Sequence, residues 1–93
     1  MDLQRLDLQR LETASNEIRF KLLKQLTNGP GYAAKFASDF KIERKTISFH
    51  LAQLEKVKLV EHNLTLSNNR AVKEYKITTI GRRICEYISA FKN

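Results

Sequence analysis

The sequence has few of the residues that build disulfide frameworks, metal clusters or membrane spans. Its 93 residues include one cysteine, one proline, three glycines and no tryptophan. The lone Cys85 has no partner for a disulfide within the chain, and no Cys/His cluster has the spacing of a metal site. No apolar run approaches the roughly 18 residues that a membrane-spanning helix needs, and no signal-peptide pattern is present. These absences predict a cytoplasmic protein with no membrane partner and no cofactor.

The sequence also lacks the side-chain arrangements that catalysis requires. It has no recognisable nucleophile–base pair, no carboxylate dyad and no glycine-rich loop that could cradle a phosphate. His50 and His62 fall on different predicted elements, so we expect each to be packed or solvated rather than a ligand. The chain is therefore predicted not to be an enzyme.

What the sequence does have is an excess of positive charge. Seventeen basic and ten acidic side chains give a net charge of +7 and a pI near 9.8. The excess is densest in residues 41–58, which hold five basic and two acidic residues. Such a balance favours a polyanionic partner, although by itself it fixes neither the fold nor the partner.

The segment 41–60 has the pattern of one amphipathic helix that runs into an extended segment. Ile47, Leu51 and Leu54 recur at helical spacing and can anchor one side in a core. At about 100° per residue, the opposite side carries Lys45, Ser48, Phe49, Ala52 and Lys56, with Thr46 and Gln53 at its flanks. This face suits the DNA major groove, which is wide enough to admit a helix. Taken alone, the segment fits an ordinary solvated helix face equally well.

The neighbouring elements favour the DNA-binding interpretation. Residues 28–31 end an earlier helix, because Gly29 can cap it and Pro30 cannot continue it. A short helix then covers residues 32–40, and the basic helix follows at 43–57. Two helices joined by so short a link, of which the second has a basic outer face, are typical of a helix-turn-helix, here spanning residues 32–57. Glu43 is a poor N-cap, and the turn lacks the glycine often found there.

A two-stranded hairpin is predicted for residues 59–78. Its turn falls at 67–70, so Arg70 and Lys73 lie at or near the tip, where a basic side chain can reach a phosphate or a minor groove. A solubilising role remains an alternative for Lys73. The predicted fold is one domain over 1–93, mainly α with a small β hairpin, in the order α-α-α-α-β-β-α.

Two apolar helices flank this unit. Residues 1–12 form a leucine-rich arm, and residues 79–92 form a helix with a long apolar stripe. We expect both to build a homodimer interface; the alternatives are a frayed terminal helix and simple closure of the core. The predicted interface residues are Leu3, Leu6, Leu8, Leu11, Ile84, Tyr87, Ile88 and Phe91.

Particular residues resemble a known family. Thr46-Ile-Ser-Phe-His-Leu51, followed by Leu54 and Lys58-Leu-Val60, is similar to the TVS-x-HL-x-x-L…GLV signature of ArsR-type winged helix-turn-helix transcriptional regulators. Residues 18–23 resemble the xR-xx-IL helix of that family, and residues 75–78 its Y-x-L-T wing strand. Residues 78–82 resemble the T-x-x-G-R ending of MarR and PadR relatives. The resemblance covers roughly residues 15–82.

The resemblance implies a sequence-specific regulator of transcription that binds double-stranded DNA. It implies a homodimer, more specifically a repressor, that reads a palindromic site with one recognition helix per subunit, 43–57, in the major groove and with the wings on flanking DNA. The implied contacts are Arg44, Lys45, Thr46, Ser48, Phe49, Gln53 and Arg70, to which the hairpin pattern adds Lys73. For His50 the resemblance implies a structural or phosphate-side role.

One departure from the family pattern bears on metal sensing. Metal-sensing members carry a cysteine-rich motif in the first helix of the helix-turn-helix, whereas residues 32–40 hold no thiol. The final helix offers Cys85 and Glu86 but no His or Asp, so no metal is expected. Two other functions stay open: a winged helix that contacts proteins, and one that coats DNA without sequence preference.

Overall fold

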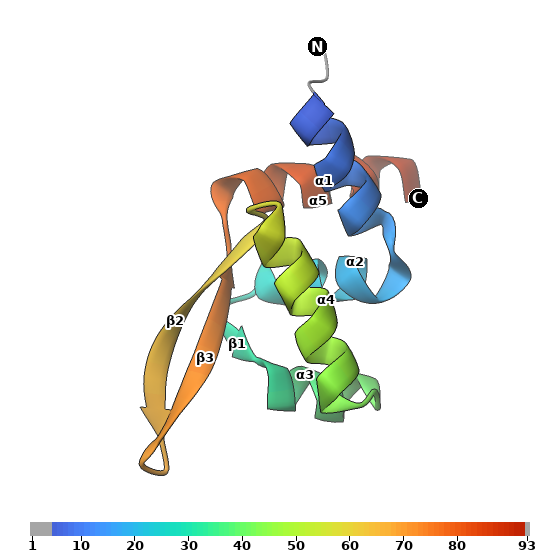
Figure 1. Ribbon diagram of the computed structural model, residues 1–93. Coiled ribbons are helices and arrows are strands. Elements are labelled where there is room, and N and C mark those ends of the chain that lie inside the picture. Colours follow the sequence, from blue (N-terminus) through green and yellow to red (C-terminus); the bar gives the residue numbers. More distant parts are fainter. Residues whose placement is uncertain (1–4, 93) are drawn as a thin grey trace.

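The computed structural model describes residues 5–92, which form five helices and one small antiparallel sheet (Figure 1). The helices are α1 (Arg5–Ser15), α2 (Glu17–Leu26), α3 (Ala33–Phe40), α4 (Arg44–Lys56) and α5 (Thr79–Lys92). The strands are β1 (Gly31–Tyr32), β2 (Val60–Ser67) and β3 (Arg70–Ile77). The predicted class, mainly α with a small β hairpin, is confirmed.

The predicted element order lacked one strand. β1 lies between α2 and α3 and pairs with β3, so that the sheet has the order β1-β3-β2. Tyr32 therefore belongs to a strand, and α3 begins one residue later than expected, at Ala33. A strand of two residues is too short to show an alternating pattern, so it could not be predicted from the sequence.

The turn between α3 and α4 is built without a glycine. Lys41 takes the left-handed conformation there, with φ 56° and ψ 45°, and Ile42 N–H donates to the Ala37 carbonyl at 3.1 Å. This is the geometry in which a helix most often ends on glycine. Glu43 precedes α4 and makes no side-chain capping bond, as its residue type predicts.

The junction between α4 and the hairpin is a Schellman motif. Lys58 is left-handed (φ 67°), its N–H donates to the Glu55 carbonyl, and Leu59 N–H donates to the Leu54 carbonyl, each at 3.0 Å. At the other end of β2, Asn68 and Asn69 both have positive φ. Two-residue turns with positive φ at both positions match the twist of the flanking strands.

Thr78 and Gly81 fix the start of α5 against this junction. The Thr78 hydroxyl accepts from Gly81 N–H at 2.9 Å, and it also lies 2.7 Å from the Lys58 carbonyl oxygen, to which it donates. A Cβ on Gly81 would lie only 2.1 Å from the Leu59 carbonyl oxygen. The T-x-x-G spacing thus combines a helix cap with a close backbone approach.

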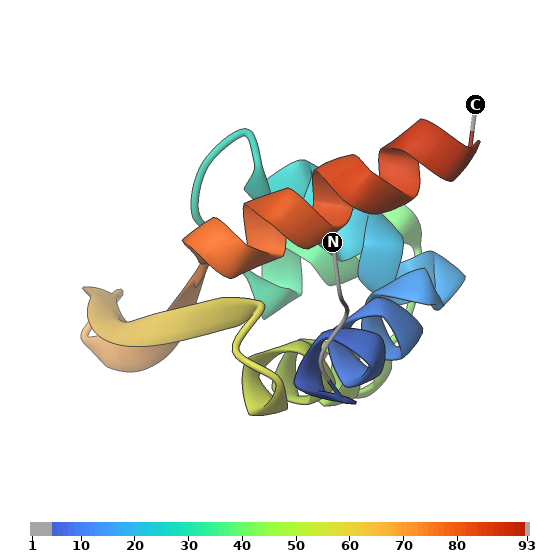
Figure 2. The ribbon, with the colours of Figure 1, turned by 90° about the horizontal axis from the view of Figure 1, so that it is seen from above.

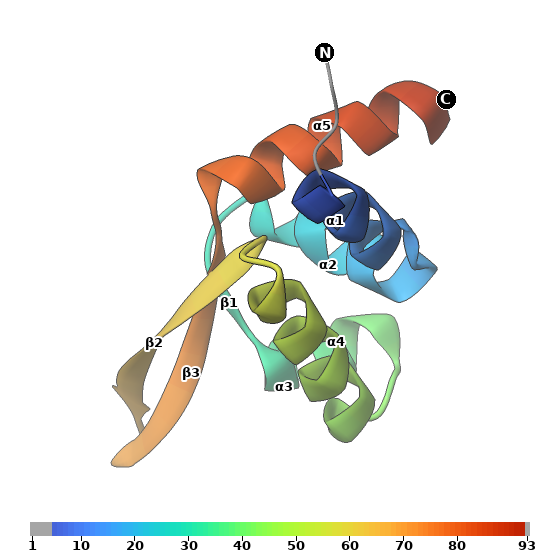
Figure 3. The ribbon, with the colours of Figure 1, turned by 45° about the horizontal axis from the view of Figure 1, so that its top comes forward.

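The core lies between the helices and the base of the hairpin. Its largest fully buried side chains are Leu22, Leu23, Leu26, Ile47, Leu51, Leu54, Leu59 and Val60. α5 crosses one end of the molecule beside α1, whereas the hairpin projects past α4 toward the other end (Figures 2 and 3). Within the described residues, no helix is long and apolar enough to cross a membrane.

Replacing Gly81 by alanine should destabilise the fold. The new Cβ would press on a backbone oxygen that is itself hydrogen-bonded, so α5 must move; overpacking of this kind costs about 2 kcal/mol. Urea denaturation of Gly81→Ala measures the loss, and Arg83→Ala, an exposed position on the same helix, is the matched control. Equal stability of the two variants would show that the close approach is not needed.

Candidate nucleic-acid interface

The outer face of α4 is exposed where the sequence predicts it. Ile47, Leu51 and Leu54 bury one side of the helix completely. The other side presents the exposed residues Arg44, Lys45, Ser48, Phe49, Ala52 and Lys56, with Thr46 and Gln53 half-buried at its edges. Phe49 keeps 53% of its surface exposed, which is unusual for a large apolar side chain and makes it available for contact.

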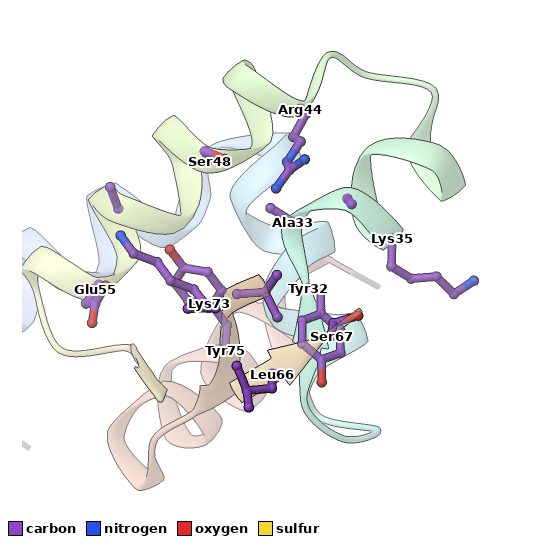
Figure 4. Close-up of a pocket in the computed structure, with 14 residues that line it drawn as sticks. Tyr32, Ala33, Lys35, Arg44, Ser48, Glu55, Leu66, Ser67, Lys73 and Tyr75 are labelled. Carbon is purple, nitrogen blue, oxygen red and sulfur yellow. The ribbon is translucent and has the colours of Figure 1, made fainter. Parts of the chain in front are cut away.

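A groove of about 680 Å³ separates α4 from the hairpin. Arg44 and Ser48 line it from α4, and Lys73 and Tyr75 project into it from β3 (Figure 4). Lys45, Phe49 and Gln53 do not line this groove. Three of the predicted contacts are thus brought together in one hollow, which is lined with cationic and hydroxyl groups suited to phosphate.

Arg70 stands apart from the groove, at the first position of β3 next to the turn. It pairs with Ser67 across the hairpin and is exposed. The neighbouring strand adds two exposed leucines, Leu64 (67%) and Leu66 (79%). The hairpin tip therefore carries a cation and apolar groups far from the core.

Lys35 and Tyr32 also line the groove, and the sequence pattern did not single them out. Lys35 lies 3.0 Å from Asp39 along the exposed face of α3, and the Tyr32 hydroxyl donates to Glu74 at 3.0 Å. Both reach the groove because β1 pairs with β3 and carries the start of α3 to the hairpin. Since β1 itself left no signal in the sequence, neither did these positions.

One carboxylate lines the groove among these basic groups. Glu55 Oε2 lies 2.6 Å from His62 Nδ1, so the two side chains join the end of α4 to β2. The His62 ring lies beside the Tyr75 ring, with centroids 5.6 Å apart. Burial, together with the charge of Glu55, raises the pKa of Tyr75, so its hydroxyl remains a neutral hydrogen-bonding group.

His50 is packed rather than exposed, with 8% of its surface accessible. Its Nδ1 accepts a hydrogen bond from Arg19 Nε at 3.0 Å, and its ring meets Phe49 edge-on at 5.3 Å. Burial and the Arg19 charge lower the pKa of His50, because a second cation would be desolvated beside the guanidinium. The imidazole is thus held neutral with Nδ1 as acceptor, in a structural role.

The predicted dimer residues divide into exposed and buried groups. Leu8 (49%), Tyr87 (42%) and Phe91 (73%) are exposed, while Leu11 and Ile84 are half-buried. A groove of about 300 Å³ lies between α1 and α5 and is lined by Leu11, Ile84 and Tyr87 with Asp7, Arg10, Ile80 and Arg83. Leu3 and the side chain of Leu6 lie outside the described part of the chain.

Ile88 requires a correction to the predicted interface. It is only 7% exposed and belongs to the core cluster of its own chain. The apolar stripe of α5 is wide enough to face both the core of its own chain and the outside, and Ile88 lies on the side that faces the core. Cys85 lies on the same side with 3% exposure, and burial raises the pKa of its thiol. A disulfide between subunits through Cys85 would require α5 to leave its place.

Residues 14–63, from the end of α1 into β2, match the family described as a helix-turn-helix domain. The chain belongs to the helix-turn-helix domain family. A helix-turn-helix-type transcriptional regulator of Methanocaldococcus jannaschii, itself uncharacterised, is 37% identical over 65 residues, which cover 70% of this chain and 68% of the relative. The protein is thus a helix-turn-helix transcriptional regulator and not an enzyme.

Solved structures show the winged variant of this fold. A candidate MarR-family regulator of Enterococcus faecalis V583 superposes with a TM-score of 0.79 at 20% identity, covering 98% of this chain and 83% of its own. The homodimeric winged helix-turn-helix DNA-binding domain of a candidate ArsR-family regulator of Mycobacterium bovis gives 0.77 at 18% identity, covering 94% and 78%. These likenesses show a winged helix-turn-helix fold, in which this chain has the successive helices α3 and α4 followed by the β2–β3 hairpin.

Acid should destabilise this helix-turn-helix protein through His50. The folded-state pKa of His50 lies below its ordinary value of about 6.5, so the unfolded chain binds the proton more readily. The contribution of neutral His50 to the free energy of unfolding is therefore complete above about pH 6.5, and it is lost as the pH falls toward the folded-state pKa. Urea denaturation at a series of pH values from about pH 8 to about pH 5 measures the slope of the free energy of unfolding against pH.

His50→Asn is the matched variant for that titration. An amide oxygen can still accept the Arg19 hydrogen bond, but the side chain does not titrate in this range. The variant should show a shallower loss of stability with falling pH than the native chain. Identical slopes would mean that the pKa of His50 is not lowered in the folded protein.

Proposed function

We propose that the protein is a homodimeric repressor of the ArsR type that binds a palindromic site in double-stranded DNA. In this proposal α4 of each subunit enters a major groove, and the wing lies on flanking DNA. The observation that carries the proposal is the exposed face of α4, where Lys45, Ser48 and Phe49 stand next to a groove lined by Arg44 and Lys73. Cationic, hydroxyl and flat apolar groups are the ones that read base edges and thymine methyls.

The groove between α4 and the wing suits the DNA backbone. Arg44 and Lys73 supply donors to phosphate oxygens, while Glu55, the one carboxylate among the described residues that line it, is engaged by His62. Phosphate contacts of this kind fix the register of a protein on the duplex but carry no sequence information. Lys45, Ser48 and Phe49 would therefore specify bases, and Arg70 would hold the wing on the backbone.

The ArsR assignment rests on the motif Thr46–Leu51 and not on the fold, since ArsR-type and MarR-type structures superpose equally well. The M. bovis neighbour is described as homodimeric. For this chain, the dimer is supported by Leu8, Tyr87 and Phe91, which are exposed along α1 and α5. Because a dimer with two α4 helices would cover adjacent major grooves, it would block that stretch of DNA, which supports repression.

Two other functions compete with specific DNA binding. A coating protein would bind all duplexes alike with a steep dependence on salt, and a protein-contact module would bind no duplex at physiological salt. Selection of bound duplexes from a random pool separates the three cases. Recovery of one palindromic sequence supports the proposal, whereas recovery of unselected sequences or of nothing overturns it.

Substitutions on α4 and on the wing should have different effects. Lys45→Ala and Ser48→Ala should reduce the preference for the selected duplex by about tenfold, since each removes a base contact worth about 1–3 kcal/mol. Arg70→Ala should weaken binding to all duplexes and lower the salt slope by about one unit. Fluorescence anisotropy over a salt series measures both quantities.

Lys21→Ala is the control for the loss of charge, because Lys21 is exposed on α2 and lies outside both α4 and the groove. It should leave the sequence preference unchanged. If Lys45→Ala, Ser48→Ala and Arg70→Ala all bind like the native chain, the proposed DNA-facing surface is wrong.

The dimer proposal predicts a native mass of two chains at micromolar concentration. A double substitution, Leu8→Glu with Phe91→Glu, should shift the protein to monomer, because it places charges in an apolar interface. Leu66→Glu is the matched control, since Leu66 is as exposed as Phe91 but lies on the wing. Native mass spectrometry reads the result, and a monomeric native chain would refute the interface.

A further inference from the structure

Arg10 contacts the recognition helix from outside the DNA-facing surface. From α1, its Nε donates to the Val57 carbonyl oxygen at 3.0 Å, although 47 residues separate the two. Val57 caps the C-terminus of α4, where the last carbonyls have no partner within the helix and carry the negative end of its dipole. The Arg10 side chain is only 11% exposed, and its Nη1 lies 3.3 Å from Asp7 Oδ1.

Arg19 makes a second contact, near the middle of α4. From α2, its Nε donates to His50 Nδ1 at 3.0 Å, and its Nη1 donates to the Thr13 carbonyl oxygen at 3.2 Å. Thr13 lies in the last turn of α1, so this carbonyl also lacks a helical partner. One guanidinium therefore joins three helices, α1, α2 and α4.

The two contacts fall on α4 about two helical turns apart, at His50 and Val57. The apolar stripe of α4 packs through aliphatic side chains, whose attraction has little directional preference. Hydrogen bonds do depend on angle and distance. Two of them, separated along the helix, therefore restrict both the rotation and the tilt of α4 in a way that apolar packing does not.

We propose that Arg10 and Arg19 are positioning residues that set the orientation of α4 and thereby its choice of DNA sequence. This inference rests on the proposed function, since it concerns how the base-reading helix is held. Both guanidinium groups donate to acceptors of the protein itself, and neither arginine lies on α4 or lines the groove between α4 and the hairpin. Arg10 also lines the groove between α1 and α5, so it connects the proposed subunit interface to α4.

The first experiment compares Arg10→Met and Arg19→Met, singly and together, with Arg10→Lys, Arg19→Lys and the charge control Lys21→Met. The measured quantity is the ratio of affinities for the selected duplex and a random duplex at one salt concentration. Each methionine variant should lower this ratio by about tenfold, the loss expected for one hydrogen bond to a charged donor. The lysine variants, which keep a donor, should recover part of it.

Lys21→Met should leave the ratio unchanged while removing the same charge. If the double methionine variant discriminates between the duplexes as well as the native chain does, the proposal is overturned. The lysine variants keep the test decisive if a methionine variant does not fold, because they retain the charge and most of the packing.

Amide hydrogen exchange of the DNA-free protein supplies an independent readout. In the methionine variants, amides of α4 should exchange about tenfold faster relative to amides of α5. If the ratio of the exchange rates of α4 and α5 is unchanged, Arg10 and Arg19 do not hold α4 in place, whether or not the protein binds DNA. If α4 exchanges faster in the variants but the native protein prefers no duplex, Arg10 and Arg19 do position α4, and the proposed function is wrong.

Discussion

The helices and the hairpin pack around one side of α4, which is buried in the core. Ile47, Leu51 and Leu54 are completely removed from solvent. Each such side chain contributes about 1.5–3 kcal/mol when buried, so the helix cannot turn without losing a large part of the stability of a small domain. The opposite side is thereby forced outward. It carries Lys45 and Ser48, which have no role in the core.

The elements around α4 convert this exposed side into a surface. The Schellman motif at Lys58 turns the chain directly into β2, and the Thr78 hydroxyl ties the end of β3 back to the same junction. The β2–β3 hairpin consequently starts at the C-terminal end of α4 and diverges from the helix toward its tip (Figure 3). The result is a groove with a basic lining, in which Glu55 is engaged by His62. Helices α1 and α5 lie on another side, where their exposed apolar residues can meet a partner without obstructing the groove.

Much of this could be predicted from the sequence, because it depends on local periodicity. The stripe Ile47, Leu51 and Leu54, the punctuation at Gly29-Pro30 and the turn at residues 67–70 each arise within a few residues. The exposed face of α4 follows from the same pattern. Ile88 shows the limit of such reasoning: a stripe identifies apolar positions, but it does not say which of them face the core of the same chain and which face outward.

The helices, the hairpin and the chemical character of the α4 face thus follow from patterns that are local in the sequence. The tertiary structure decided which groups meet. Arg19 and His50 are 31 residues apart, Arg10 and Val57 are 47 apart, and Tyr32 reaches Glu74 across 42. Contacts over such distances leave no periodic trace, since each depends on how whole elements pack and not on the spacing of residues within one element.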